Sequence, residues 1–216
     1  MLHLQKISKI YWKNEQRIIA LPPTDLTVGT GEFIAIRGAS GSGKTTLLLI
    51  AGGLLHPNSG HVVVQGEDLY RMQSGERANW RSRNIGFVFQ QYHLLPYLSV
   101  LDNVLVPQLA AEVDGLQDRA VDLIDHFGLA QRQSHFPSEL SAGEKQRVAL
   151  ARALLLKPRI ILADEITGNL DGHNADIVLH SLHEFVDQGG SVVLATHDAG
   201  AAAQAHRILS LSMDKT

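Results

Sequence analysis

The sequence predicts an α/β fold whose sheet is mostly parallel and covered by helices on both faces. Short apolar runs alternate with segments of helical periodicity along most of the 216 residues, a pattern typical of strands joined by crossover helices. Polar residues directly follow several of these runs, and ligands of such sheets bind beyond the carboxyl ends of the strands. The first thirty residues instead alternate apolar and polar side chains, which predicts an antiparallel β-lobe.

Length and composition favour a single domain over residues 1–216, with a small helical lobe at about 91–140. The net charge of −3, from 19 basic and 22 acidic residues, does not favour a nucleic-acid surface. The absence of cysteine excludes disulfides and thiolate zinc sites, and fits the cytoplasm. The apolar stretches are far shorter than the ~20 residues that span a bilayer, and no signal peptide is recognised. We therefore expect any membrane role to come through a partner.

The β-lobe and the first strand of the main sheet come first in the chain. Residues 2–12 are expected to form an edge strand. The strand pattern continues over 18–21 and 26–28, with Pro22-Pro23 as an expected break between them. The continuous apolar run at 33–36 predicts a buried strand.

The loop after this strand carries the clearest functional motif. Residues 38–46 match the phosphate-binding pattern G-x-x-x-x-G-K-[ST], between the apolar strand and a helix start. Glycines let successive N–H groups point inward, and the helix N-terminus adds a positive dipole. Lys44 can place a charge on the β- and γ-phosphates of a triphosphate, and the Thr45 hydroxyl can ligate Mg²⁺. The expected phosphate-binding residues are Gly38, Ala39, Ser40, Gly41, Ser42, Gly43, Lys44, Thr45 and Thr46.

The rest of the chain alternates strands and helices. Strands are expected at 61–66, 85–89, 160–163, 191–195 and 208–211, and helices at 74–83, within 100–136, and at 143–156 and 174–186. The helix over 143–156 is expected to end at Pro158 because proline cannot continue it.

Two further stretches can serve phosphate chemistry. Asp164 and Glu165 end a buried apolar strand, where two acids cost solvation unless a cation or ligand repays it. Asp164 is suited to hold Mg²⁺ and Glu165 to polarise an attacking water, although an acid pair that caps a helix is the alternative. Ser141 and Gly143 open the next-to-last long helix and can form an anion site, and Ser141 with Glu144 also fits an ordinary capping box.

These elements together resemble the nucleotide-binding subunit of an ABC transporter, over nearly the whole chain. The matching elements, in order, are the phosphate loop, Gln90, Leu140–Glu144, Asp164-Glu165, Asn169-Leu170-Asp171 and His197. The resemblance implies a P-loop NTPase fold that binds ATP and Mg²⁺. It also implies a homodimer that sandwiches ATP at its interface, and a separate transmembrane subunit that holds the chain at the inner face of the cell membrane.

The resemblance assigns roles to single residues. It implies that Ser141 and Gly143 contact the γ-phosphate held by the opposite copy, and that Asp171 lies at the dimer seam. Tyr11 falls where the family stacks an aromatic ring on adenine, with Trp12 as the competing candidate. The implied catalytic residues are Glu165, His197, Gln90 and Lys44, and the implied metal ligands are Thr45, Gln90 and Asp164.

The details of the motifs resemble the lipoprotein-releasing and macrolide-export ATPases. Two positions depart from the family pattern: Ala142 stands in place of a glycine, and Ile166 in place of a proline. Either could slow turnover, because a methyl group crowds the loop and the lost proline loosens the backbone.

The sequence thus predicts an ATPase subunit that moves a separate membrane protein. One alternative is a regulatory ABC ATPase that signals to a wall hydrolase or sensor without transport. A soluble ABC ATPase of DNA repair or translation is disfavoured because the chain is acidic and has room for only a compact lobe. An unrelated P-loop kinase has no use for Ser141 or His197 in these contexts.

Overall fold

The computed structural model of the chain describes residues 2–64, 66–110 and 113–212, and it confirms the predicted α/β class. A parallel sheet has the strand order β6-β7-β8-β3-β9, and an antiparallel sheet has the order β2-β1-β4-β5. The parallel strands are β3 (Phe33–Arg37), β6 (Ile85–Val88), β7 (Ile160–Asp164), β8 (Ser191–Thr196) and β9 (Arg207–Ser210). The antiparallel strands are β1 (Leu2–Lys13), β2 (Gln16–Val28), β4 (Ser59–Val64) and β5 (Glu67–Asp68).

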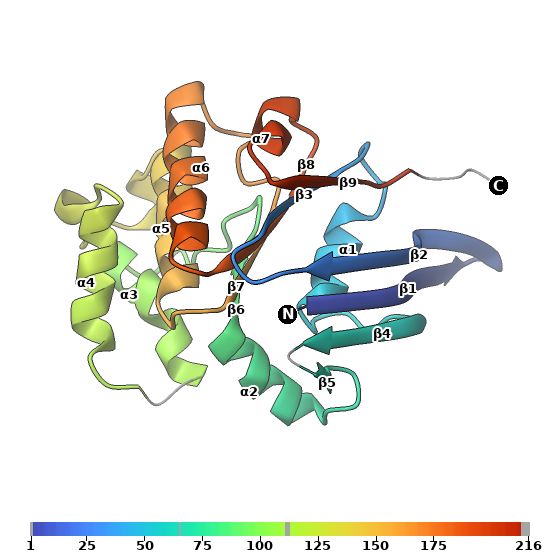
Figure 1. Ribbon diagram of the computed structural model, residues 1–216. Helices are drawn as coiled ribbons and strands as arrows, with labels where there is room; N and C mark the ends of the chain where they lie inside the picture. The colour runs from blue at the N-terminus through green and yellow to red at the C-terminus, as the bar shows by residue number, and fades with distance from the viewer. Residues whose placement is uncertain (1, 65, 111–112, 213–216) are drawn as a thin grey trace.

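The helices complete a layered arrangement around the parallel sheet. They are α1 (Lys44–Ala51), α2 (Ser74–Asn84), α3 (Val100–Leu105), α4 (Leu116–His126), α5 (Ala142–Leu154), α6 (Gly172–Asp187) and α7 (Ala199–Ala203). Figure 1 shows α3, α4, α5 and α6 gathered on one side of the parallel sheet, with the antiparallel sheet and α1 on the other. None of the helices in the described ranges is long and apolar enough to cross a membrane.

Strand β7 shows how the sequence fills both layers. Its five residues are all buried, as expected for a parallel strand covered on both faces. Ile161 and Ala163 belong to the apolar cluster formed with α3 to α6, whereas Ile160 and Leu162 belong to the cluster formed with α1 and the antiparallel sheet. This alternation follows from the two-residue period of a strand, and it fixes β7 between two cores.

A buried asparagine organises the start of the helical segment that follows β6. Asn103 on α3 is fully buried, and its side-chain amide donates to the carbonyl oxygens of Leu95, Leu98 and Ser99 at 3.0–3.1 Å. Its carbonyl oxygen accepts the Leu95 N–H at 2.7 Å. Because all these bonds go to the backbone, they hold residues 95–99 in one shape, with Tyr97 75% exposed.

Two expectations about the β-lobe are wrong. Strand β1 is not an edge strand, because it pairs with β2 on one side and with β4 on the other. Pro22 and Pro23 do not interrupt β2, which runs through them. They lie between Leu21 and Thr24, where the register with β1 shifts, and β2 is at the sheet edge. Proline is tolerated at such places because no ladder donor is required of it.

The burial of Ile161 in β7 predicts that truncating it destabilises the fold far more than truncating an exposed isoleucine. Ile161 is fully buried, whereas Ile208 on the edge strand β9 is 45% exposed. Ile161→Ala should lower the free energy of unfolding by about 2–5 kcal/mol because it leaves a cavity. Ile208→Ala should lower it by less than about 1 kcal/mol. Urea denaturation of both variants checks this, and equal losses would contradict the layered core.

Candidate functional site

The phosphate loop lies where the sequence places it, between β3 and α1, and its glycines are required by close contacts. Gly43 caps α1 with φ 94°, and a Cβ there would lie 2.4 Å from the Ala20 carbonyl oxygen. A Cβ on Gly38 would lie 2.4 Å from the Ser42 hydroxyl and 2.7 Å from the Leu211 carbonyl oxygen. Both positions therefore exclude larger residues, and the loop can curl above the N-terminus of α1.

Lys44 is buried at the centre of this loop and is held by three oxygen atoms. Its ammonium donates to the carbonyl oxygens of Gly38 at 2.9 Å and Ala39 at 3.2 Å. It also lies 3.2 Å from Glu165 Oε1, with 6% and 14% of the two side chains exposed. The cation is thus paired within the chain, where a phosphate would otherwise neutralise it.

Thr45 and Asp164 form the second part of the site. The Thr45 hydroxyl donates to Asp164 Oδ2 at 2.7 Å, which joins the first turn of α1 to the end of β7. Burial raises the pKa of the Asp164 carboxyl, and the hydrogen bond from Thr45 partly offsets that rise. The other oxygen, Asp164 Oδ1, is buried and has no hydrogen-bond partner in the described structure. An orphaned carboxylate oxygen beside a hydroxyl is a suitable ligand set for a divalent cation.

Glu165 contacts two other predicted residues, His197 and Lys44. Its Oε2 is hydrogen-bonded to His197 Nδ1, and its backbone N–H donates to the Ala195 carbonyl oxygen at 2.8 Å. The residue has φ 52°, a left-handed conformation that is costly for a side chain other than glycine. The adjacent ends of β7 and β8 thus bring Glu165 and His197 together, with Lys44 on the other side of the carboxylate.

An open cleft of about 760 Å³ joins these groups. Its lining includes the predicted residues Ser40, Gly41, Gly43, Lys44, Thr45, Thr46, Gln90, Glu165 and His197. It also includes three residues of β2 that the sequence analysis missed, Ile18, Ile19 and Ala20. No local motif marks them, because they reach the cleft only through the pairing of β2 with β1. They add an apolar wall opposite the charged groups.

Tyr11 lies beside this wall but is not itself among the lining residues. It pairs with Ile18 across the β1–β2 ladder and is 45% exposed, with the Lys9 ammonium 5.3 Å from its ring centre. Trp12 is further along the same hairpin, opposite Arg17, and is 71% exposed. Both aromatic rings are therefore exposed on the β1–β2 hairpin, where either can stack on a ligand.

Ser141 and Gly143 are outside this cleft, at the start of α5. Ser141 caps α5, with its Oγ accepting the Glu144 N–H at 3.2 Å and its own N–H donating to Glu144 Oε2 at 2.8 Å. A Cβ on Gly143 would lie 2.3 Å from Asn174 Oδ1. The Asn174 side chain also donates to the carboxylate of Asp171, which caps α6. The starts of α5 and α6 therefore form one connected surface apart from the phosphate loop.

Ala142 and Ile166 fit their surroundings. Ala142 is the exposed first residue of α5, a position that suits alanine as the strongest helix former. Ile166 is 2% exposed and packs in the core between the parallel sheet and α5 and α6. A proline here would favour an extended backbone at Glu165, whereas Glu165 is left-handed.

Comparison with known proteins agrees with this geometry. The family model described as ABC transporter matches residues 21–168. The lipoprotein-releasing system ATP-binding protein LolD of Shewanella sp. strain MR-4 is 44% identical over 98% of this chain and 93% of its own length. The macrolide export ATP-binding/permease protein MacB 1/2 of Paracoccus denitrificans is 42% identical over 98% of this chain, which corresponds to 32% of that longer protein.

Solved structures are similar over the same extent. The dimeric structure of MJ0796, a bacterial ABC transporter cassette, has a TM-score of 0.92 and 37% identity, and covers 98% of this chain and 94% of its own. A second structure of MJ0796, in a post-hydrolysis state bound to ADP and Pi, has a TM-score of 0.92 and 36% identity.

The capping box of α5 predicts a pH-dependent contribution to stability. The hydrogen bond from the Ser141 N–H, helped by the nearby Arg132, holds the pKa of Glu144 below its ordinary value of 4.5. A lowered folded-state pKa stabilises the fold above the unfolded-state pKa, and this contribution is lost as the pH falls through the folded-state value. Glu144→Gln should therefore unfold at lower urea concentration than wild type at neutral pH, and the difference should shrink below about pH 4.5.

Glu67→Gln is the matched control for that measurement, because Glu67 is exposed on β5 and its side chain makes no hydrogen bond or ion pair with the described residues. It should change the urea midpoint little at any pH. If the urea midpoint of Glu144→Gln stays below that of wild type by the same amount down to pH 3, the carboxylate charge is not the source of the stabilisation.

Proposed function

The chain belongs to the ABC transporter family as an ATP-hydrolysing cassette, and from this premise we propose how its residues bind and split ATP. The observation that carries the proposal is the meeting of Lys44, Glu165 and His197 in one cleft, with Asp164 joined to it through the hydroxyl of Thr45. The loop amides and Lys44 bind the phosphates, the apolar wall of Ile18 and Ile19 lies beside the base, and Tyr11 stacks on adenine from the rim.

Binding requires Lys44 to exchange partners. In this structure its ammonium is held by two loop carbonyls and by Glu165 Oε1. The β- and γ-phosphates offer a stronger charge, so Lys44 turns toward them and releases Glu165. The freed carboxylate can then polarise a water for in-line attack on the γ-phosphate, while His197 keeps the carboxylate oriented and donates toward the transferred group. Gln90, at the end of β6, lines the cleft where it can position that water.

Mg²⁺ fits the same site. Asp164 Oδ1 and the Thr45 hydroxyl are the proposed protein ligands, directly or through water, and Gln90 completes the set. No group of three histidine, cysteine, aspartate or glutamate side chains in the described ranges could hold a metal alone, as is usual for sites that share Mg²⁺ with substrate phosphates. When bound, the ion neutralises charge on the phosphate oxygens.

The ATP site is completed by a second copy of the chain. Ser141 and Gly143 do not line the cleft of their own chain, and the N-terminus of α5 offers N–H groups to an anion. We place these groups on the γ-phosphate held by the opposite copy, with Asp171 at the seam. The dimeric MJ0796 cassette supports this arrangement.

The proposed cellular role is to drive a separate membrane protein from the cytoplasmic face of the cell membrane. The relatives named for lipoprotein release and macrolide export support export or mechanical work of this kind. The match covers 93% of the length of that LolD and 32% of the length of that MacB. A regulatory ATPase that signals to a wall hydrolase would use the same cleft and the same dimer.

The composite site predicts that ATP joins two copies when hydrolysis is blocked. Glu165→Gln keeps the side-chain shape but removes the charge that polarises water. This variant should bind ATP, lose at least about 100-fold in turnover, and elute as a dimer with ATP and as a monomer without it. Size-exclusion chromatography with light scattering measures the change.

Lys44→Ala is the control for that experiment, since loss of the phosphate-binding charge should abolish both hydrolysis and ATP-dependent dimerisation. A Glu165→Gln protein that binds ATP and remains monomeric at high concentration would refute the composite site for the isolated chain. Near-normal ATPase activity of Lys44→Ala would refute the assignment of the phosphate site.

The exposed segment ahead of α3 predicts a contact with the membrane partner. Tyr97 is 75% exposed, and its loop is fixed by Asn103, so the ring is presented without the freedom of a loose loop. Tyr97→Glu should leave the ATPase activity in solution unchanged, because Tyr97 does not line the nucleotide cleft, and should reduce co-sedimentation with host membranes several-fold. Leu54→Glu, at another exposed apolar residue, is the control, and equal sedimentation of both variants would contradict the assignment.

A further inference from the structure

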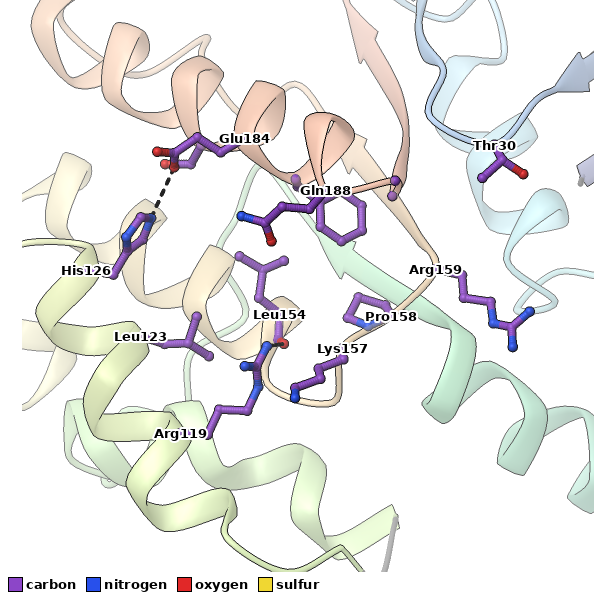
Figure 2. Close-up of a pocket in the computed structure, with 14 residues that line it drawn as sticks. Thr30, Arg119, Leu123, His126, Leu154, Lys157, Pro158, Arg159, Glu184 and Gln188 are labelled. Atoms are coloured by element: carbon purple, nitrogen blue, oxygen red, sulfur yellow. Dashed lines mark hydrogen bonds and ion pairs between the residues drawn. The ribbon is translucent and has the colours of Figure 1, made fainter.

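A second cleft lies at the amino ends of the parallel strands, whereas the nucleotide site lies at their carboxyl ends. It has a volume of about 1170 Å³ and is formed by one side of α4, the C-terminal parts of α5 and α6, and the turns that enter β7 and β8 (Figure 2). Arg159 and Gly190, which directly precede these two strands, are part of its lining. The nucleotide cleft is at the carboxyl ends of the same strands, so the two sites are separated by the length of the sheet.

The lining of this cleft carries an excess of positive charge. Arg119 and Lys157 contribute two cations, Arg159 also lines the cleft although its guanidinium extends away from them, and Glu184 is the one carboxylate among the described lining residues. Glu184 is already engaged, at 3.2 Å from His126 Nε2 and 3.5 Å from His180 Nε2. Asp122 on α4 is outside the lining, and its carboxylate interacts electrostatically with the Arg119 guanidinium. The ammonium of Lys157 and the guanidinium of Arg159 have no partner among the described residues.

Arg119 and Lys157 meet at the end of α5. The Leu154 carbonyl oxygen accepts the Lys157 N–H and an Arg119 guanidinium N–H, both at 3.0 Å. Arg119 also donates to the Leu155 carbonyl oxygen at 2.8 Å, which leaves its remaining N–H groups free for a ligand. Figure 2 shows the Lys157 side chain extending beside that guanidinium, whereas Arg159 extends away on the far side of Pro158.

Lys157 stands at a position where a lysine has a conformational cost. Its φ of 51° is in the left-handed region, where glycine or asparagine ends a helix with less strain. Lys157 is exposed and makes no ion pair with the described residues, so no salt bridge offsets this conformational cost. Strain of this kind is a reason to look for a function of the side chain.

The rest of the lining suits a peptide more than a compact anion. Leu123, Leu154, Pro158 and Phe185 supply an apolar floor, and the cleft is larger than the ~300–1,000 Å³ typical of small-molecule pockets. Figure 2 shows the carboxamide of Gln188 pointing into the cleft above Leu154. A carboxamide offers one acceptor and a donor group, which matches a peptide bond.

We propose that this cleft binds an acidic peptide segment of a partner protein, with an apolar side chain on the floor and carboxylates at Lys157 and Arg119. The charge complementarity selects acidic over neutral segments, and the concave shape selects an inserted segment over a membrane surface. The cleft shares no lining residue with the nucleotide cleft, so the binding test below does not depend on the ATPase mechanism.

The test uses the full chain and a fluorescein-labelled hexapeptide with four carboxylates around a central leucine and phenylalanine. Fluorescence anisotropy should show saturable binding that weakens with added salt, and the same peptide with amides in place of carboxylates should bind at least fivefold more weakly. Lys157→Asn should weaken binding of the acidic peptide about threefold, and Lys157→Glu about tenfold, as expected for a partly exposed ion pair.

Lys6→Asn is the matched control, because Lys6 is also an exposed lysine at positive φ, on β1 and outside the cleft lining. It removes the same charge and should leave binding unchanged. Lys157→Asn should retain ATPase activity and unfold no earlier than wild type, since asparagine relieves the left-handed strain. Loss of peptide affinity in that protein therefore reports the ligand contact rather than the fold.

Three results would overturn the proposal. The first is absence of binding by wild type at millimolar peptide. The second is equal affinity of the wild type and Lys157→Glu for the acidic peptide. The third is Lys157-dependent binding to vesicles of anionic lipid in the absence of any peptide binding, which would assign the cations to a membrane surface.

Discussion

The candidate site depends on the parallel register of β7 between β6 and β8. Hydrogen bonding pairs Ala163 with Leu194 and Asp164 with Ala195, so the residues that follow these strands emerge at one level. Strand β3 pairs in parallel with the other side of β8, so the phosphate loop that follows β3 lies at the same end of the sheet. Because both faces of β7 are buried, a shift of its register would move the carboxylates and disrupt both cores at once.

Most of the polar side-chain atoms at the carboxyl ends of these strands have partners within the chain. Lys44 neutralises Glu165, the Thr45 hydroxyl covers one oxygen of Asp164, and His197 covers the second oxygen of Glu165. Two features still cost free energy: the left-handed backbone at Glu165, and the Asp164 oxygen that has no hydrogen-bond partner in the described structure. Both costs are located on groups proposed to change partners during the reaction, which is where strained conformations are usually retained.

The sequence predicted the parts of the site that depend on local chemistry. Gly43 has the positive φ that the loop requires, Gly38 lies against Ser42 of the same loop, and Asp164 with Glu165 directly ends an apolar run, so each is visible as a motif. Ile18 and Ile19 were missed because their place is decided by ladder pairing across the hairpin and by the docking of one sheet against the other. The continuous strand through Pro22 and Pro23 was missed for a related reason, since only its edge position and the register shift make proline acceptable there.

Helix α5 gives the two clefts a mechanical relation. Ser141 caps its first turn, and the carbonyls of its last turn are held by Arg119 beside Lys157. A helix of 13 residues is a rod about 20 Å long, and its middle is buried against β6 and α3. Because the helix is one rigid element, a ligand that tilted one end of it would displace the other end as well. Under the proposed composite site, such a tilt would couple the nucleotide held by the neighbouring copy to ligand affinity at the far cleft, and by thermodynamic linkage the coupling would be equal in both directions.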